Sequence, residues 1–156
     1  MSKTAILIGY GGMGKRYYQA LKLLKIKVVV ICDKKINKIS KENFEKNIVF
    51  ETDYRVLLKY NADLLCIASN TQSRFKILSF FCKNGNIKRI LTEKPLATSY
   101  SNCLQIKKIV KKNRIKLIVN THRSYSPNFL FLKKIFKKNK EQPTSIFINS
   151  PSAGMG

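Results

Sequence analysis

The fold of this chain is decided by residues 5–14, which read Ala5-Ile6-Leu7-Ile8-Gly9-Tyr10-Gly11-Gly12-Met13-Gly14. The four apolar residues predict a short buried strand, and the residues from Gly14 onward predict a helix. The glycines between them are spaced Gly-x-Gly-x-x-Gly. In such a loop the first glycine permits a tight turn, the second lets the backbone approach a pyrophosphate, and the third lets the helix pack closely on the strand. We therefore predict that the loop binds NAD or NADP, with its phosphates at the helix N-terminus.

An acidic residue follows the loop at the expected distance. Asp33 stands nineteen residues after Gly14, where the second predicted strand ends. A carboxylate there accepts hydrogen bonds from the adenine-ribose diol and repels a 2′-phosphate, so Asp33 favours NAD. Lys34 and Lys35 come next and could hold that phosphate, which leaves NADP open. Asp33 could also be an ordinary turn residue at a strand end.

The same glycines also resemble a phosphate loop of the NTPase type. Four residues lie between Gly9 and Gly14, and Lys15 follows. That loop requires Ser or Thr as its next residue to ligate magnesium, and this chain has Arg16. The dinucleotide loop therefore explains the spacing better.

Apolar runs alternate with helical patterns along the chain. Strands are predicted at residues 5–8, 28–32, 48–50, 64–68, 87–91 and 115–119. Helices are predicted, among others, at residues 14–24, 73–83 and 99–112. The short β-branched runs are typical of strands buried on both faces of a parallel sheet. The alternation predicts an α/β fold of the Rossmann type, a doubly wound parallel sheet with helices on both faces.

The pattern changes after residue 119. Residues 127–139 predict one more helix, Pro143 interrupts the chain, and residues 144–149 predict a new strand. We expect an NAD(P)-binding domain over residues 1–122. Residues 123–156 are expected to form a linking helix and the first strand of an incomplete C-terminal α/β domain. Because glycine-rich residues follow that strand at once, we expect the chain to be cut short or to lack a partner domain.

The composition fits a globular domain in a reducing compartment. The chain has 156 residues, 44% of them hydrophobic, and no apolar run approaches the roughly 18 residues that span a membrane. Its start does not read as a signal peptide. The four cysteines lie far apart in the sequence and predict free thiols, so we expect a cytoplasmic protein. With His122 as the only histidine, we expect no metal site.

The net charge of +23 allows two interpretations. One is binding to nucleic acid or an anionic surface, which requires a contiguous basic face. The other is compositional drift, since Lys, Asn and Ile are the residues that an AT-biased coding sequence favours. The lysines are spread over the whole chain, which favours drift, and we expect no specific nucleic-acid partner and no membrane partner.

Three further segments lie at the ends of predicted strands, where ligands bind in such sheets. They read Ala68-Ser69-Asn70-Thr71, Thr92-Glu93-Lys94-Pro95-Leu96-Ala97 and Asn120-Thr121-His122-Arg123-Ser124-Tyr125-Ser126-Pro127. Together with the glycine loop, they resemble the motifs of the Gfo/Idh/MocA family of NAD(P)-dependent oxidoreductases. The most specific of them is Glu93-Lys94-Pro95. The resemblance covers essentially the whole chain.

The resemblance implies a Rossmann domain followed by a C-terminal α/β domain, and a substrate that is a sugar, a sugar nucleotide or a related polyol. It implies hydride transfer between the substrate and nicotinamide. Lys94 would be the catalytic residue, orienting the substrate or helping to move a proton at the oxidised hydroxyl. The expected cofactor-binding residues are Gly9, Tyr10, Gly11, Gly12, Met13, Gly14, Asp33, Lys34, Ser69, Asn70, Thr71, Glu93, Lys94, Pro95, Asn120 and Arg123.

Two departures from the family pattern stand out. Ser69, Asn70 and Arg74 replace the Thr, Pro and His that the loop after the fourth strand often carries, so any role of that His is lost. We also expect most of the C-terminal domain, which in the family usually supplies a catalytic His and supports oligomers, to be absent from this chain. Alternatives therefore stay open. Lys94 and Arg123 could be surface charges, residues 69–71 could cap a helix, and the chain could be a catalytically inactive dinucleotide-binding module.

Overall fold

The central element is one sheet of six parallel strands in the order β3-β2-β1-β4-β5-β6. The computed structural model describes residues 3–39 and 44–139. The strands are β1 (Thr4–Ile8), β2 (Lys27–Cys32), β3 (Val49–Glu51), β4 (Leu64–Ile67), β5 (Arg89–Glu93) and β6 (Lys116–Asn120). The chain builds the sheet outward from β1 to β3, returns to β4 beside β1, and then continues outward to β6. This doubly wound order confirms the predicted Rossmann-type fold.

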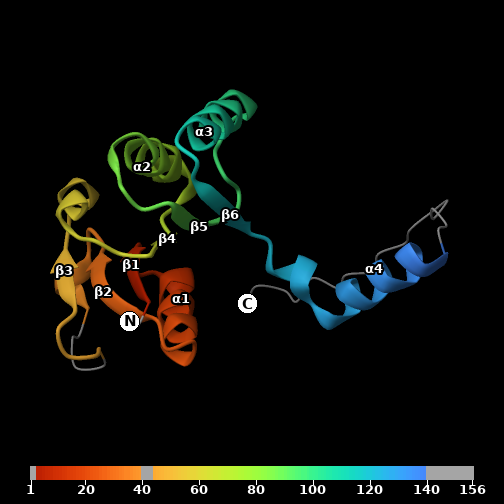
Figure 1. Cartoon of the computed structure of the whole chain (residues 1–156). Coiled ribbons are helices and arrows are strands. Elements are labelled where there is room, and N and C mark those ends of the chain that lie inside the picture. Colours follow the sequence, from red (N-terminus) through yellow and green to blue (C-terminus); the bar gives the residue numbers. More distant parts are fainter. Residues whose placement is uncertain (1–2, 40–43, 140–156) are drawn as a thin grey trace, which may run out of the picture. The chain divides into compact units, whose positions relative to one another are not determined.

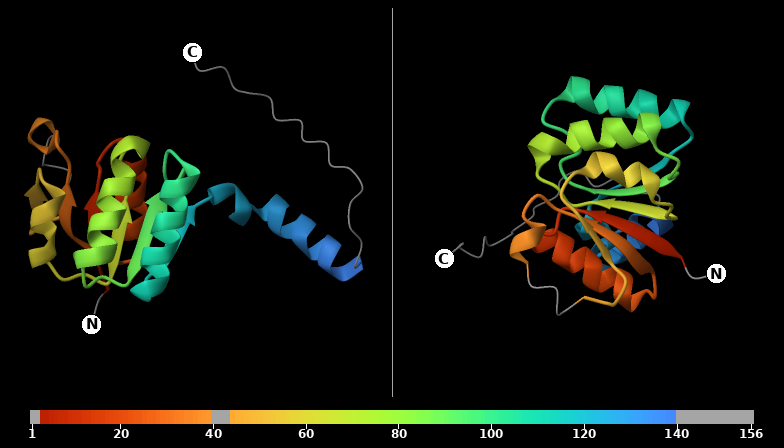
Figure 2. Two further views of the ribbon diagram at one scale, coloured as in Figure 1. Left: turned by 90° about the horizontal axis from the view of Figure 1, so that it is seen from above. Right: turned by 90° about the vertical axis from the view of Figure 1, so that its left-hand side faces the viewer.

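Helices cover both faces of this sheet, as predicted. Helix α1 (Gly12–Leu23) lies against one face, and helices α2 (Thr71–Asn84) and α3 (Tyr100–Lys112) lie against the other (Figures 1 and 2). Short 3₁₀ helices, η1 (Ile36–Lys38) and η2 (Tyr54–Lys59), stand before and after β3. Exposed lysines occur on α1, α2 and α3 alike. The cations therefore lie over both faces, which favours compositional drift over a dedicated nucleic-acid surface.

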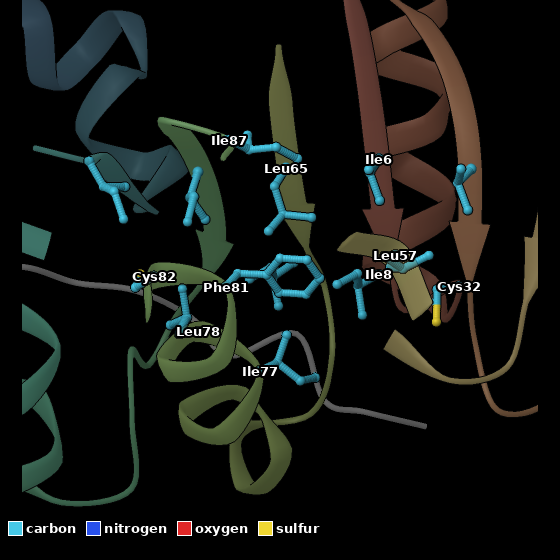
Figure 3. Packing of buried hydrophobic residues seen from close by; sticks show 14 of the residues in the cluster. Ile6, Ile8, Cys32, Leu57, Leu65, Ile77, Leu78, Phe81, Cys82 and Ile87 are labelled. Carbon is cyan, nitrogen blue, oxygen red and sulfur yellow. The ribbon is translucent and has the colours of Figure 1, made fainter. Parts of the chain in front are cut away.

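The alternation of side chains along each strand explains the unbroken apolar runs. In β1, Ile6 and Ile8 pack on the α2 side with Phe81, whereas Ala5 and Leu7 pack on the α1 side. All four of these residues are buried, because helices cover both faces. Figure 3 shows the α2 side of this core, where Phe81 lies among residues of β1, β4 and η2. Burial on both faces is what the β-branched runs predicted.

One predicted strand is displaced along the sequence. Residues 87–91 were expected to form the fifth strand, but β5 runs from Arg89 to Glu93. Ile87 is buried although it precedes the strand, so its apolar character reflects core packing and not strand pairing. The shift matters for the site, because it pairs Glu93 with Asn120 at the last register position of β5 and β6.

The chain divides into two compact units, Met1–Asn120 and Thr121–Gly156. In the second unit the structure describes the 3₁₀ helix η3 (His122–Tyr125) and helix α4 (Pro127–Asn139), which matches the predicted helix. Several apolar side chains of α4 are exposed, including Phe129, Phe131 and Leu132. The strand predicted at residues 144–149 lies outside the described residues.

Two further predictions from the sequence concern the cysteines and membrane-spanning helices. All four cysteines are free; Cys32, Cys66 and Cys82 are buried and Cys103 is half-buried. Among the described residues, no helix has the length and apolar character needed to cross a membrane.

Candidate cofactor-binding site

The carboxyl ends of β1, β2, β4, β5 and β6 meet at one edge of the sheet, because all strands are parallel. The order reverses between β1 and β4, and such a switch point is where open α/β sheets bind ligands. Ala68 N donates a 2.7 Å hydrogen bond to Ile8 O and so joins the two strands where their loops begin. The segments predicted to bind the cofactor in the first unit all follow strands at this edge.

The glycine loop requires glycine at its first and third positions for steric reasons. Gly9 has φ +88°, and a Cβ on it would lie 2.8 Å from the Ala68 carbonyl carbon and 2.9 Å from Ser69 N. A Cβ on Gly14 would lie 2.0 Å from Gly9 O. Gly9 therefore permits the turn against β4, and Gly14 permits α1 to pack on that turn. Both roles agree with those predicted for a dinucleotide loop.

The second glycine is different, because nothing in the fold crowds it. A Cβ on Gly11 or Gly12 would meet no atom within 4 Å, and both residues are exposed. Gly11 stands directly before α1 and accepts the first helical hydrogen bond, from Lys15 N at 2.9 Å. Open space thus lies over backbone at the positive end of a helix dipole. This arrangement fits a pyrophosphate.

Asp33 lies beside this loop and holds it in place. Its Oδ2 accepts a 2.7 Å hydrogen bond from Tyr10 N, and its Oδ1 accepts one of 2.8 Å from Lys35 N. Gly9 N also donates to Cys32 O at 2.8 Å, so the loop is tied to the end of β2 twice. Asp33 is half-buried, and each oxygen keeps a lone pair for a further hydrogen bond. The carboxylate thus fixes its own turn and also holds the glycine loop.

Tyr10 extends the loop toward an aromatic cluster. Its ring centroid lies 5.0 Å from that of Phe44 and 6.1 Å from that of Tyr18. Met13 packs partly buried against the same core. The side chains of Tyr10 and Met13 therefore pack against the core, while Gly11 and Gly12 stay open.

At the end of β5, Glu93 is buried and accepts hydrogen bonds from two side chains. Its Oε1 accepts hydrogen bonds of 2.6 Å from the Tyr17 hydroxyl and 2.6 Å from Asn120 Nδ2. Burial alone would raise the pKa of this carboxyl. The hydrogen bonds from Tyr17, Asn120 and the Lys94 backbone, together with the charge of Arg74, hold the pKa below its usual value. Glu93 is therefore an ionised carboxylate that joins α1, β5 and β6.

Arg74 on α2 is the second buried charge at this edge and is only 3% exposed. Its Nη1 donates to Pro95 O, and its Nη2 donates to Ser69 O at 2.5 Å. Burial lowers the pKa of Arg74, whereas the charges of Glu93 and Tyr17 act to raise it. This side chain links the loop after β4 to the loop after β5.

The remaining predicted residues are placed as follows. Lys94 and Pro95 are exposed just beyond β5 and are joined by a cis peptide bond. Asn70 caps α2, since its Oδ1 accepts a 2.9 Å hydrogen bond from Ser73 N, which confirms the capping alternative for that residue. Thr71 begins the helix. Arg123 belongs to η3 in the second unit and its side chain is not described.

Sequence reasoning missed two parts of this site. Tyr17 stands three residues after Gly14, a spacing that puts it on the buried face of α1, but nothing in the sequence indicated a carboxylate partner. Arg74 was noticed as a departure from a motif and was given no role. A lone arginine in a basic chain reads as an exposed charge, and only its burial in the fold shows otherwise.

Comparison with known proteins agrees with this geometry. The family model described as an oxidoreductase family with an NAD-binding Rossmann fold (Gfo/Idh/MocA) matches residues 3–121. No curated protein matches the sequence. Among solved structures, a myo-inositol 2-dehydrogenase from Lactobacillus plantarum is similar, with a TM-score of 0.78 and 21% identity over 90% of this chain. The structure covers 42% of that protein.

Two further solved structures show the same fold. The WlbA dehydrogenase from Bordetella pertussis, in complex with NADH and UDP-GlcNAcA, has a TM-score of 0.78 and 18% identity over 89% of this chain and 43% of its own. The scyllo-inositol dehydrogenase from Lactobacillus casei, with bound NAD(H) and scyllo-inositol, has a TM-score of 0.76 and 15% identity over 90% and 42%. The chain thus spans less than half the length of these proteins.

Proposed function

The chain belongs to the Gfo/Idh/MocA oxidoreductase family and holds its NAD-binding Rossmann fold, and from this premise we propose that it forms the cofactor half of an NAD-dependent dehydrogenase. The observation that carries the proposal is the loop of residues 9–14. Its first and third glycines are required by the fold, whereas Gly11 and Gly12 face open space. That selective openness is explained by a ligand that approaches the backbone closely.

The residues present fit each part of a dinucleotide. The loop and the start of α1 would hold the pyrophosphate through backbone N–H groups. The Asp33 carboxylate, already oriented by Tyr10 N and Lys35 N, would accept hydrogen bonds from the adenine-ribose hydroxyls. The loops after β4 and β5, which contain Ser69 and Lys94, would border the nicotinamide half.

Asp33 supports NAD in preference to NADP. Its Oδ2 accepts from Tyr10 N of the glycine loop and its Oδ1 from Lys35 N of the turn after β2, so the carboxylate is fixed at the position that we propose for the adenine ribose. A 2′-phosphate there would lie against a fixed negative charge. Lys34 and Lys35 are exposed and offer the opposite charge nearby, so the preference is one of degree.

We propose that Lys94 takes part in proton transfer at the substrate hydroxyl. When NAD is bound, its nicotinamide supplies the hydride acceptor or donor. The Lys94 side chain is exposed beyond β5, and none of the described residues pairs with its ammonium group. Its Nζ is therefore free to hold a substrate hydroxyl and to take part in moving the proton of that hydroxyl. The substrate we propose is a sugar, a sugar nucleotide or a polyol, the class named for the similar structures.

Calorimetric titration of the 156-residue chain with NAD and NADP, run side by side, tests this proposal. We expect saturable binding of both, with NAD the tighter ligand. The matched variant is Gly11→Val, which adds bulk where a Cβ meets no atom within 4 Å, so we expect it to fold and to lose binding. Failure of the wild-type chain to bind either dinucleotide would overturn the proposal.

A further inference from the structure

Two loops of the site are tied together by one side chain from outside both of them. Arg74 lies on the first turn of α2, and its two terminal nitrogens donate to Ser69 O and Pro95 O. Ser69 follows β4, and Pro95 follows β5 directly after Lys94. The contacts are with backbone carbonyls, so they fix the course of the loops whatever their side chains are.

This arrangement is costly for the fold. Arg74 is 3% exposed, and within the described residues its Nε has no hydrogen-bond partner. A buried charge is destabilising unless it is paired and fully hydrogen-bonded. The carboxylate nearby, Glu93, directs its Oε1 to Tyr17 and Asn120 and acts on Arg74 only through its charge. What such a buried charge does at this position is shown by its two acceptors, Ser69 O and Pro95 O, which belong to the two loops of the site.

We propose that Arg74 is a positioning residue for the nicotinamide half of the cofactor. By holding Ser69 O and Pro95 O on a single rigid guanidinium, it sets the spacing between the two loops and thereby the place of Lys94. The buried carboxylate of Glu93 offsets its charge electrostatically. This inference rests on the proposed function, since it assigns one half of the dinucleotide to the two loops.

The inference can be tested because Arg74 contacts only one of the two parts of the proposed site. Arg74 touches the loops after β4 and β5 and has no contact with Asp33 or the glycine loop among the interactions described. ADP-ribose carries the adenine, both phosphates and the second ribose of NADH but lacks the nicotinamide. Loss of Arg74 should therefore weaken NADH binding and spare ADP-ribose binding.

The experiment compares wild type, Arg74→Lys and Arg74→Met by calorimetric titration with NADH and with ADP-ribose. Arg74→Lys keeps the charge but cannot hold two carbonyls with one planar group. We expect both variants to bind NADH about tenfold more weakly or worse, as expected for lost charge-assisted hydrogen bonds, and ADP-ribose within about twofold of wild type. The fluorescence of bound NADH should also fall toward that of free NADH. Arg89→Lys, the same change at an exposed site at the start of β5, should alter neither.

The outcomes distinguish a failure of the proposed function from a failure of the role proposed for Arg74. Wild-type chain that binds neither ligand overturns the proposed function together with this inference. Equal weakening of NADH and ADP-ribose, or no weakening of either, overturns the inference alone and leaves Arg74 a residue of the fold. If both variants fail to fold, hydrogen exchange on wild-type chain decides the question. NADH should slow exchange at residues 69–71 and 93–96 and ADP-ribose should not, and equal protection by both overturns the inference.

Discussion

Tyr17 donates a 2.6 Å hydrogen bond to Glu93, although 76 residues separate them in the sequence. Tyr17 is on the helix that begins at the glycine loop, and Glu93 precedes Lys94 at the end of β5. The bond therefore connects the part of the site that we assign to the pyrophosphate with the part that we assign to the reacting groups. Since Glu93 is buried and ionised, this is a charge-assisted bond away from water.

Tyr17→Phe should destabilise the fold by about 1.5–3 kcal/mol near pH 7, the range for hydrogen bonds to charged groups. The reason is that Glu93 loses one of two side-chain donors on Oε1. Because the folded-state pKa of Glu93 lies below its usual value, its stabilising contribution is present at neutral pH and is lost as pH falls through that lowered pKa. In the variant the pKa of Glu93 rises, so the difference in unfolding free energy between wild type and variant should shrink on acidification. Urea denaturation of both proteins at several pH values measures this difference in unfolding free energy.

Tyr18→Phe is the matched control for this prediction. Tyr18 is the next residue on α1, is also buried, and its hydroxyl accepts a 3.1 Å hydrogen bond from Glu45 N. That bond involves no ionised partner, so its loss should cost less, about 0.5–1.5 kcal/mol, and should not vary with pH in the acid range. A difference for Tyr17→Phe that stays constant from neutral to acid pH would contradict the ionised state of Glu93.

Gly9→Ala and Gly11→Ala should have opposite profiles in stability and binding. Alanine at position 9 adopts an unfavourable positive φ and meets the Ala68 carbonyl at 2.8 Å, so we expect a loss of more than about 2 kcal/mol of stability. Alanine at position 11 meets nothing within 4 Å and should leave thermal unfolding nearly unchanged. NAD binding should nevertheless weaken in Gly11→Ala, because the new methyl group lies where the phosphates approach. Calorimetry and thermal denaturation of both variants distinguish the effects, and unchanged NAD affinity in Gly11→Ala would count against the loop as the pyrophosphate site.

The sequence predicted those parts of the fold and site that depend on neighbours along the chain. The β-branched runs, the glycine spacing and Asp33 are local features, and, apart from β5, the strands, the loop and the acid beside it lie where they were expected. Helix α4 matches its predicted bounds because its apolar spacing and Pro127 mark it locally. The position of β5 was predicted two residues too early because Ile87 is apolar. Its apolar character reflects packing in the core and does not indicate strand pairing.

The features that the sequence did not predict depend on contacts between distant segments. The partner of Tyr17 is on β5, and the partners of Arg74 are backbone carbonyls, which have no signature in a sequence. A tyrosine on an apolar helix face predicts burial but not the acid that its hydroxyl meets. The residue pairs that join the loops of this site could therefore be found only once the strand order had placed them at one edge.

Cys103 should be the reactive thiol of the folded chain. Burial raises the pKa of Cys32 and Cys66 to about 12 and that of Cys82 to about 11, so these thiols carry almost no thiolate at pH 8. Cys103 on α3 is half-buried and accessible. Iodoacetamide at pH 8, followed by mass spectrometry, should label about one site quickly in native protein and all four after denaturation. Cys103→Ser should remove the fast phase, and rapid labelling of two or more thiols in that variant would contradict the buried core.

Asp33→Asn should shift the cofactor preference from NAD toward NADP. The asparagine has one carbonyl oxygen in place of two carboxylate oxygens, so either Tyr10 N or Lys35 N loses its acceptor and NAD should bind about tenfold more weakly. The same change removes the negative charge that opposes a 2′-phosphate, while exposed Lys34 and Lys35 remain. NADP affinity should therefore hold or rise.

The ratio of the two affinities is the decisive quantity, because damage to the loop would weaken both ligands alike. Parallel titrations with NAD and NADP give that ratio for wild type, for Asp33→Asn and for Asp63→Asn. The last variant removes an exposed acid directly before β4, at the opposite edge of the sheet from the glycine loop, where its carboxylate accepts a 2.8 Å hydrogen bond from Thr4 N. It changes the net charge of the chain by the same amount and should leave the ratio unchanged. If Asp33→Asn weakens NAD and NADP by one common factor, Asp33 acts only by holding the glycine loop, and the preference for NAD must come from other residues.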